Sequence, residues 1–367
     1  MKKKVTLKHL FTLTEIISPN SNRHKIKQAI LADDIEWLSI VKLANTHFLT
    51  AALYYSLLQN NLLKYITDKE LLDYLKNIYN INLKRNQKIV TQSVEISNIL
   101  LLQNIRPVFL KGTASLLQND YPDLGMRFLS DIDFLVQENV HNDATELLKE
   151  ANYLSHANTS KNPDWHHSPP MYHEKWDMVI EIHRYVLPYK FLSIIPTEQS
   201  NQVKNEKYQN IFNLTPTYRL LHAYIHSEIV DGHYYTKTIN LRQLYEIAIL
   251  VQKYQYEIDW VELKMILTKE HNYKKFTHTL SLVIQLFHIE IEALKHTKVS
   301  TVHSKLRVLH FKHLDTVLSS TYLAYHRFIR ASSKPAMQRR YGIVSRKKQI
   351  YFSIKHLFSV LKKILNI

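Results

Sequence analysis

The hydrophobic period of the sequence changes in the middle of the chain, and this change most constrains the fold. Segments such as DIEWLSIVKLANTH and FLTAALYYSLLQN repeat apolar residues at three- and four-residue spacing, which is typical of one buried helical face. From Arg106 onward the pattern becomes RPVFL, FLSDIDFLV and MVIEIHRYV, three short apolar runs with helix-like segments between them. Strands that alternate with helices predict a small α/β unit.

Helical patterns return after this unit, in YRLLHAYIHSEIV and INLRQLYEIAILVQKY. A chain of 367 residues is long enough for two or three domains. We therefore expect an α+β protein with an N-terminal helical domain (1–104), an α/β core (105–190), a C-terminal helical domain (191–294) and a basic helical tail (295–367).

The positive charge of the chain is concentrated in this tail. The formal net charge is +16, and residues 295–367 hold 16 Lys and Arg against a single acid, Asp315. Because the rest of the chain is nearly neutral, we expect the tail to meet something anionic. The terminal segment RKKQIYFSIKHLFSVLKKILNI has a basic amphipathic pattern, which fits packing on the protein itself, an anionic membrane surface or RNA.

Composition excludes several classes of site. The absence of cysteine excludes disulfides, Cys-ligated zinc and iron–sulfur clusters. No apolar run reaches the 18 residues expected of a spanning helix, and the opening MKKKVTLKHLFTLTEIIS lacks the apolar run of a signal peptide. We therefore expect a cytoplasmic protein, or one held at the inner face of a membrane by its tail.

Acidic residues interrupt two of the predicted strands. Side chains alternate between the faces of a strand, so Asp131 and Asp133 of SDIDFLV share one face, and Glu181 and His183 of MVIEIHRYV share another. Acids are depleted from strands and are rarely buried without a partner. If the two strands are neighbours, three carboxylates on one sheet face predict a site for Mg²⁺ or Mn²⁺ and for phosphoryl or nucleotidyl transfer.

Gly112 stands where the first predicted strand gives way to a helix. A glycine there permits close approach of a ligand, and the N–H groups that start the helix suit a phosphate. Thr113 adds a hydroxyl group, and Lys111 and Arg127 add positive charge. Gly125, which follows Pro122-Asp123, is expected to occupy a turn.

These residues resemble a known family. The run LKG…Y-x-D-x-G-x-R-x-x-x-D-I-D-x-L-V and the later HH-x-P-P…V-I-E-I-H resemble bacterial, largely uncharacterised nucleotidyltransferases of the DNA polymerase β-like superfamily, over roughly residues 25–290. The resemblance implies a small mixed-sheet core. It also implies that Asp131 and Asp133 are metal ligands, that Glu181 is a third ligand or a base, and that Gly112 and Thr113 form a nucleotide-phosphate loop. Thr113 replaces the usual serine and keeps the hydroxyl.

The predicted reaction is the metal-dependent transfer of a nucleoside monophosphate from a nucleoside triphosphate, such as ATP, with release of pyrophosphate. The acceptor is open. We favour a small molecule or a sugar phosphate. The alternatives are a toxin-like enzyme that nucleotidylates a protein or a tRNA, and a sensor that binds nucleotide without turnover.

Four histidines lie on the third predicted strand or before it: His166, His167, His173 and His183. They are candidates for contact with substrate or metal, or loop residues of a chain with 21 histidines. We single out His183, because it shares the face of Glu181, and His167 as the second candidate for substrate contact.

Two further pairs have helical four-residue spacing. His222 and His226 have the spacing of metal ligands, but no third ligand is evident, so packing between helices is favoured. Arg242 and Glu246 either pair with each other along one helix or reach the active site, and we favour the pair.

Overall fold

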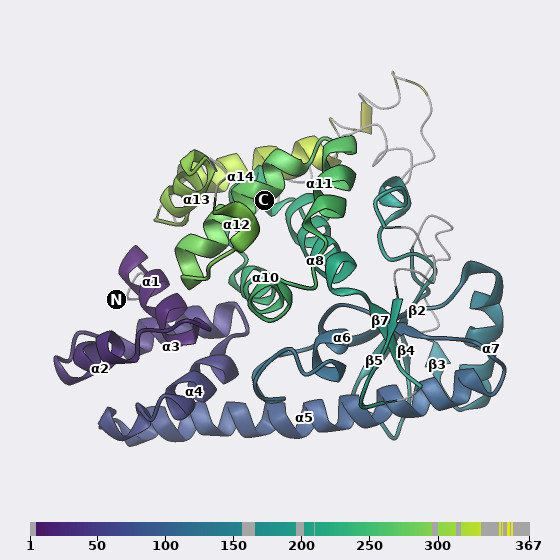
Figure 1. Ribbon diagram of the computed structural model, residues 1–367, viewed down its shortest axis with the longest axis horizontal. Helices are drawn as coiled ribbons and strands as arrows, with labels where there is room; N and C mark the ends of the chain where they lie inside the picture. The colour runs from purple at the N-terminus through teal and green to yellow at the C-terminus, as the bar shows by residue number, and fades with distance from the viewer. Residues whose placement is uncertain are drawn as a thin grey trace.

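The predicted α+β class is confirmed by the computed structural model (Figure 1). The residues that the structure describes are 5–155, 166–195, 202–208, 210–295, 300–312 and 317–331, together with 345, 347, 351, 352 and 354. Most of the predicted amphipathic helix at the end of the chain lies outside the described residues.

The N-terminal region is helical, as predicted. Its elements are α1 (Leu7–Ile17), α2 (Arg23–Leu31), α3 (Trp37–Thr46), α4 (Thr50–Gln59), the 3₁₀ turn η1 (Leu63–Tyr65) and α5 (Lys69–Leu101). The long run that begins at Lys69 is a single helix of 33 residues, started by the Asp68 side chain, which accepts from the backbone N–H of Leu71. At 1.5 Å per residue it spans about 50 Å. It therefore lies beneath both the N-terminal helices and the sheet (Figure 1).

The core is a mixed sheet in the strand order β3-β4-β5-β2-β1-β7-β6. Its strands are β1 (Val108–Phe109), β2 (Asp131–Leu135), β3 (Leu154–Ser155), β4 (Met171–Tyr172), β5 (Val179–His183), β6 (Gln202–Lys204) and β7 (Phe212–Leu214). All three predicted strands are present, and four short ones join them. Because β6 and β7 belong to the sheet, it extends beyond the predicted 105–190 core.

The two central strands, β2 and β5, run parallel and bury one face. Ile132, Phe134, Ile180 and Ile182 are fully buried in a cluster that includes residues of α5 and of α7 (His141–Glu150). The alternation of side chains then places the acids on the opposite face. That face is covered by α6 (Lys111–Leu117) and α8 (Pro216–Tyr224), whose residues line a cavity with Asp131 and Asp133.

The remaining elements are mostly helices that follow the sheet in the chain. They are the 3₁₀ turns η2 (Glu138–Val140), η3 (Tyr189–Phe191) and η6 (Glu292–Leu294), the π-helical turn η5 (Ile225–Val230), and the helices α9 (His233–Thr236), α10 (Leu241–Tyr254), α11 (Trp260–Lys269), α12 (Tyr273–Phe287), α13 (Val302–Lys312) and α14 (Val317–Ala331). Within the described part of the chain, no helix combines the length and the apolarity needed to cross a bilayer.

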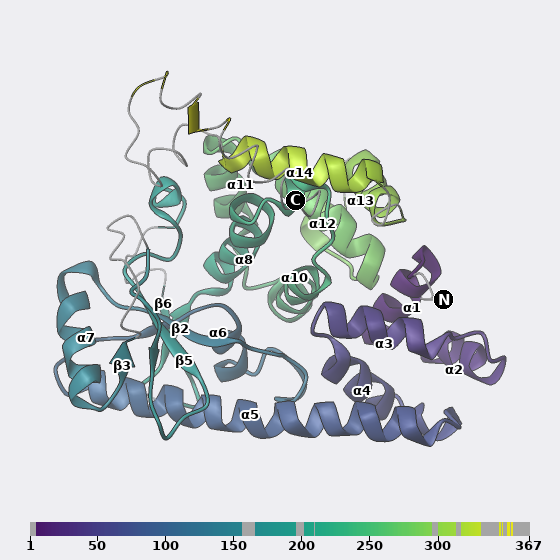
Figure 2. The same ribbon diagram turned by 180° about the vertical axis from the view of Figure 1, so that it is seen from behind.

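The two helical regions share one hydrophobic core. Leu10 and Leu13 of α1 belong to the same buried cluster as Leu280 and Phe287 of α12. The view from behind shows α1 and α3 beside α10 and α12, with the sheet at the other end of α5 (Figure 2). The N-terminal helices therefore pack against the C-terminal helices, although more than 200 residues separate them in the chain.

Candidate functional site

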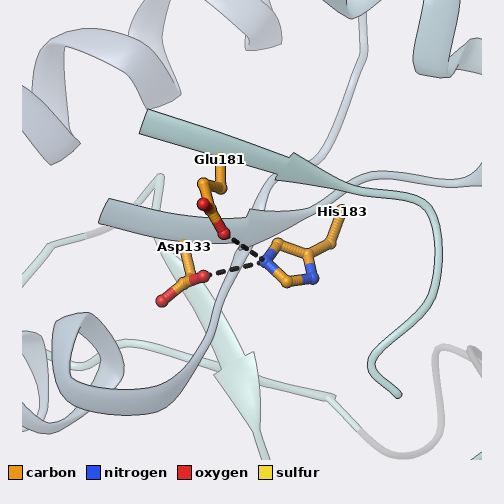
Figure 3. Close-up of side chains that lie close together, drawn as sticks. All are labelled: Asp133, Glu181 and His183. Carbon is orange, nitrogen blue, oxygen red and sulfur yellow. Dashed lines mark hydrogen bonds and ion pairs between the residues drawn. The ribbon is translucent and has the colours of Figure 1, made fainter. Parts of the chain in front are cut away.

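The acidic residues of the two central strands meet as the sequence predicts. The parallel pairing of β2 with β5 sets Asp133 opposite Glu181 and Asp131 opposite Val179. Asp133, Glu181 and His183 each offer a ligand atom, and these atoms lie within 4.8 Å of one another (Figure 3). This group contains two of the three predicted metal ligands, with His183 in place of Asp131.

Asp133 is the most tightly held member of the group. Its Oδ1 accepts from Nζ of Lys111 at 2.7 Å and from Nε2 of His183 at 2.8 Å, and its side chain is 3% exposed. Burial alone raises the pKa of Asp133, but Lys111 and His183 outweigh it and hold the pKa well below its usual range. Asp133 is therefore ionised at every physiological pH.

His183 is uncharged and completely buried. Burial is the main cause that lowers its pKa to about 4. Because a carboxylate only accepts hydrogen bonds, Nε2 carries the proton toward Asp133. The other ring nitrogen, Nδ1, is buried and has no hydrogen-bond partner among the described residues. His183 therefore supports the carboxylate from inside the protein, and a move of its proton to Nδ1 would free Nε2 as a ligand.

The other two carboxylates hold their charge less readily. Burial and the neighbouring charge of Asp133 raise the pKa of Asp131, whose Oδ1 accepts from the Ser130 hydroxyl at 2.9 Å. Burial also raises the pKa of Glu181, although His167 lies 3.8 Å away and opposes this effect. Burial and the charge of Asp133 outweigh the effect of Lys111 on both acids, and a bound cation would favour their ionised forms. Hard oxygen donors with one imidazole fit a divalent cation such as Mn²⁺ or Mg²⁺.

The residues of the predicted phosphate loop, Lys111 to Thr113, form the first turn of α6. Lys111 contacts the acidic group, whereas the side chain of Thr113 is buried. Lys111 starts α6 in a left-handed conformation (φ 49°) and reaches Asp133. A Cβ atom on Gly112 would lie 3.0 Å from Cγ of Leu129, so close packing within the protein favours glycine there. The side chain of Thr113 is fully buried, and its hydroxyl has no partner among the described residues.

Arg127 lines the cavity, but its charge is neutralised by the protein. Its Nη2 donates to Oε2 of Glu246 on α10, and both side chains are buried. The predicted pair of Arg242 with Glu246 is therefore wrong, because Glu246 pairs with Arg127 instead. Both Arg242 and Glu246 line the cavity, which is the alternative that the spacing left open.

A polar clamp from α5 holds the loop that leads to β2. Asn82 donates to the carbonyl oxygens of Gly125 and Arg127, and Asn86 donates to that of Arg127 at 2.7 Å. Tyr79 donates to Asp123 at 2.7 Å. Gly125 lies in a turn, as predicted, and a Cβ atom there would lie only 2.4 Å from Cε2 of Tyr79. The asparagine spacing of four was the signal in the sequence for this clamp.

Two cavity residues were assigned to packing from the sequence. His222 and His226 line the cavity from α8 and η5. Burial lowers the pKa of His222 well below its usual value and that of His226 to about 4, so both are neutral. Nε2 of His222 is buried without a partner among the described residues. Their four-residue spacing was visible, but only the position of α8 over the sheet shows that they face the acids.

The other predicted histidines separate into two groups. His166 and His167 form ring contacts with His183, each at 5.2 Å between centroids. His173 instead contacts the ring of Tyr153 and accepts from the backbone of Lys175. His167 is therefore the predicted substrate-contacting histidine that is both near Glu181 and partly exposed, with 21% of its side chain accessible.

A known protein family matches the part of the chain that contains this site. A family model described as an uncharacterised nucleotidyltransferase matches residues 33–288, well over half of the chain. The matched range contains every residue of the cavity and of the acidic group. No curated protein and no solved structure gave a significant match.

Proposed function

The chain belongs to this family of uncharacterised nucleotidyltransferases, and we propose that it transfers a nucleoside monophosphate from a nucleoside triphosphate to an acceptor. The observation that carries the proposal is the register that sets Asp133 beside Glu181, at the edge of a cavity with cationic walls. Acids next to cations suit a metal-bound triphosphate.

In this proposal each acidic residue has a defined task. Asp133, ionised and oriented by His183, holds a divalent cation together with Glu181, and Asp131 extends the site toward the cavity. When bound, Mg²⁺ or Mn²⁺ neutralises charge on the triphosphate. An oxygen of the acceptor attacks the α-phosphorus, the bond from that phosphorus to the bridging oxygen of the β-phosphate breaks, and pyrophosphate leaves. Glu181 takes the acceptor proton.

The start of α6 is proposed to receive phosphate. Lys111 and the backbone of Gly112 line the cavity, and free N–H groups at a helix start attract anions. Thr113 is buried beneath them, so we assign it a supporting role rather than direct contact. Arg127 is already paired with Glu246, and we propose that it positions the loop. His167 is the candidate for contact with substrate.

The experiment that tests this function is labelling with α-³²P nucleoside triphosphates, Mg²⁺ or Mn²⁺ and cell extract. Asp133→Asn is expected to abolish the labelled product. Asp177→Asn serves as a matched control, because Asp177 is an exposed acid that pairs with Lys88, and it should leave the product unchanged. Equal labelling by Asp133→Asn and the parent protein would refute the proposal.

The size of the product identifies the acceptor class. We favour a small molecule or a sugar phosphate, for which the label would migrate as a low-mass compound. A labelled protein or tRNA band would instead show a toxin-like activity. Tight binding of nucleotide without pyrophosphate release, with every extract tried, would show a sensor.

A further inference from the structure

Arg242 differs from the other cationic side chains of the cavity because it forms no ion pair with a described residue. The other three cations that line the cavity each pair with an acid: Lys111 with Asp133, Arg127 with Glu246, and Arg219 with Asp120. Arg242 also lines the cavity, yet no described carboxylate lies within ion-pair distance of it. Burial, and then the charge of Arg127, lower its pKa. Glu246 and Asp131 act on Arg242 only from beyond ion-pair distance, so Arg242 is a cavity cation that no described carboxylate contacts directly.

An aromatic stack holds Arg242 in place. Its guanidinium carbon lies 5.3 Å from the ring centroid of Phe48, and this ring stacks on Phe128 with centroids 4.8 Å apart and planes 12° apart. Phe128 lines the cavity in the segment that joins Arg127 to Asp131. The stack thus ties Arg242 to the strand that carries the acids.

Phe48 adopts a conformation that its type disfavours. It follows α3 with φ 55° and is half exposed. At seven other helix ends the left-handed residue that follows the helix is Asp, Asn or His, types that are enriched in this conformation; these residues are Asp33, Asn61, Asn104, Asn119, Asn152, His271 and His288, and Lys237 after α9 is, like Phe48, an exception. A bulky residue in a strained conformation is typical of a functional position. The stacking of the Phe48 ring on Phe128 and under Arg242 offsets this strain.

We propose that Arg242 binds the terminal phosphates of the nucleoside triphosphate, and that Phe48 positions it, so that the N-terminal helices complete the active site. The inference rests on the proposed nucleotidyl transfer. A planar guanidinium bonds phosphate through two parallel hydrogen bonds, and a triphosphate supplies an anion at the direct contact distance where Arg242 has none. In this arrangement the acids hold the metal ion that binds the triphosphate, and Arg242 holds the β- and γ-phosphates, which leave as pyrophosphate.

The test is calorimetric binding of three probes in the presence of Mg²⁺: an α,β-methylene nucleoside triphosphate, pyrophosphate and a nucleoside monophosphate. Arg242→Gln is expected to lower the affinity for the triphosphate analogue and for pyrophosphate by roughly 10- to 100-fold. The affinity for the monophosphate should stay unchanged. Phe48→Ala should lower the affinity for the same two probes by a smaller factor. Phe48→Tyr, which keeps a stacking ring, should bind them as the parent protein does. Arg106→Gln is the matched control, because exposed Arg106 lies over the ring of Phe212 and does not line the cavity.

The outcomes separate this inference from the proposed function. If the parent protein binds none of the probes, both fail together. If the parent binds the triphosphate analogue and Arg242→Gln binds it equally well, the inference is overturned and the proposed function stands. An equal loss of affinity for triphosphate and monophosphate would also overturn it, since Arg242 would then contact the part that the two share, the nucleoside or its α-phosphate. Arg242→Lys keeps the charge without the fork, and an intermediate loss in this variant supports the inference even if Arg242→Gln is poorly folded.

Discussion

The buried pair of Glu228 and Arg307 predicts how much the start of the basic tail contributes to stability. Both side chains are 0% exposed. Nη1 and Nη2 of Arg307, on α13, donate to the two carboxylate oxygens of Glu228, and Nε donates to the carbonyl oxygen of Thr238 at 3.1 Å. Glu228 lies in η5, the π-helical turn that also carries His226 into the cavity wall. Loss of Arg307 would therefore leave a carboxylate in the core beneath the site.

The expected cost of Arg307→Met is large. Removal of one partner from a buried ion pair costs about 3–5 kcal/mol, because the remaining charge stays without solvent and without a partner. Removal of both charges avoids most of this cost, since well-packed apolar residues often replace a buried pair without loss. The double variant Glu228→Leu/Arg307→Met is therefore expected to recover at least half of the lost free energy of unfolding.

Equilibrium urea unfolding at pH 7, followed by circular dichroism and tryptophan fluorescence, measures this difference. Lys305→Met is the matched control, because Lys305 is an exposed residue of the same helix, and it should change the free energy of unfolding by less than about 0.5 kcal/mol. A loss below about 1 kcal/mol for Arg307→Met, against the 3–5 kcal/mol expected, would refute the reasoning. A double variant no more stable than the single variant would refute it equally.

Three further predictions concern the loop, the pH dependence and the metal. Gly125→Ala is expected to destabilise the protein by about 1–3 kcal/mol, because the new Cβ would overlap the ring of Tyr79; thermal unfolding measures it, and a stability equal to the parent's would contradict the overlap. Burial is the main cause that lowers the pKa of His303 to about 3, below the 6.5 of an unfolded chain. The unfolded state thus binds the extra proton, and stability falls as pH drops from about 6.5 toward 3. His303→Gln should reduce the slope of stability against pH by up to about 1.4 kcal/mol per pH unit, and an unchanged slope in urea titrations would count against it. Asp133→Asn and Glu181→Gln are each expected to weaken Mn²⁺ binding at least about 10-fold, as measured by electron paramagnetic resonance without nucleotide; parent-like affinity in both variants would exclude this site.

Local pattern was sufficient to predict the acidic face of the sheet. Strand alternation places Asp131 and Asp133 on one side, and the condition that the two acidic strands are neighbours is met by the pairing of β2 with β5. Gly112, expected where a strand gives way to a helix, lies in the first turn of α6, three residues after the end of β1. These features depend on neighbours within a few residues, which a sequence displays directly.

The parts that were missed depend on contacts between distant segments. Strands β3, β4, β6 and β7 have only two or three residues, too few to show a period. The partner of Arg127 lies 119 residues away, and the roles of Phe48 and His222 follow only from which helices border the cavity. Tertiary packing, which no short window encodes, decides each of these.

The pairing of β2 with β5 has a consequence for how the chain tolerates insertions and deletions. Because Asp133 lies opposite Glu181 in a two-residue alternation, one residue added or lost inside β5 would turn Glu181 toward the buried face and bring an isoleucine beside Asp133. The same change in the connection between the strands would be absorbed without moving either acid. We therefore expect changes in length to be tolerated in the loops, whereas the register of the ten residues of β2 and β5 must be kept for the carboxylates to meet.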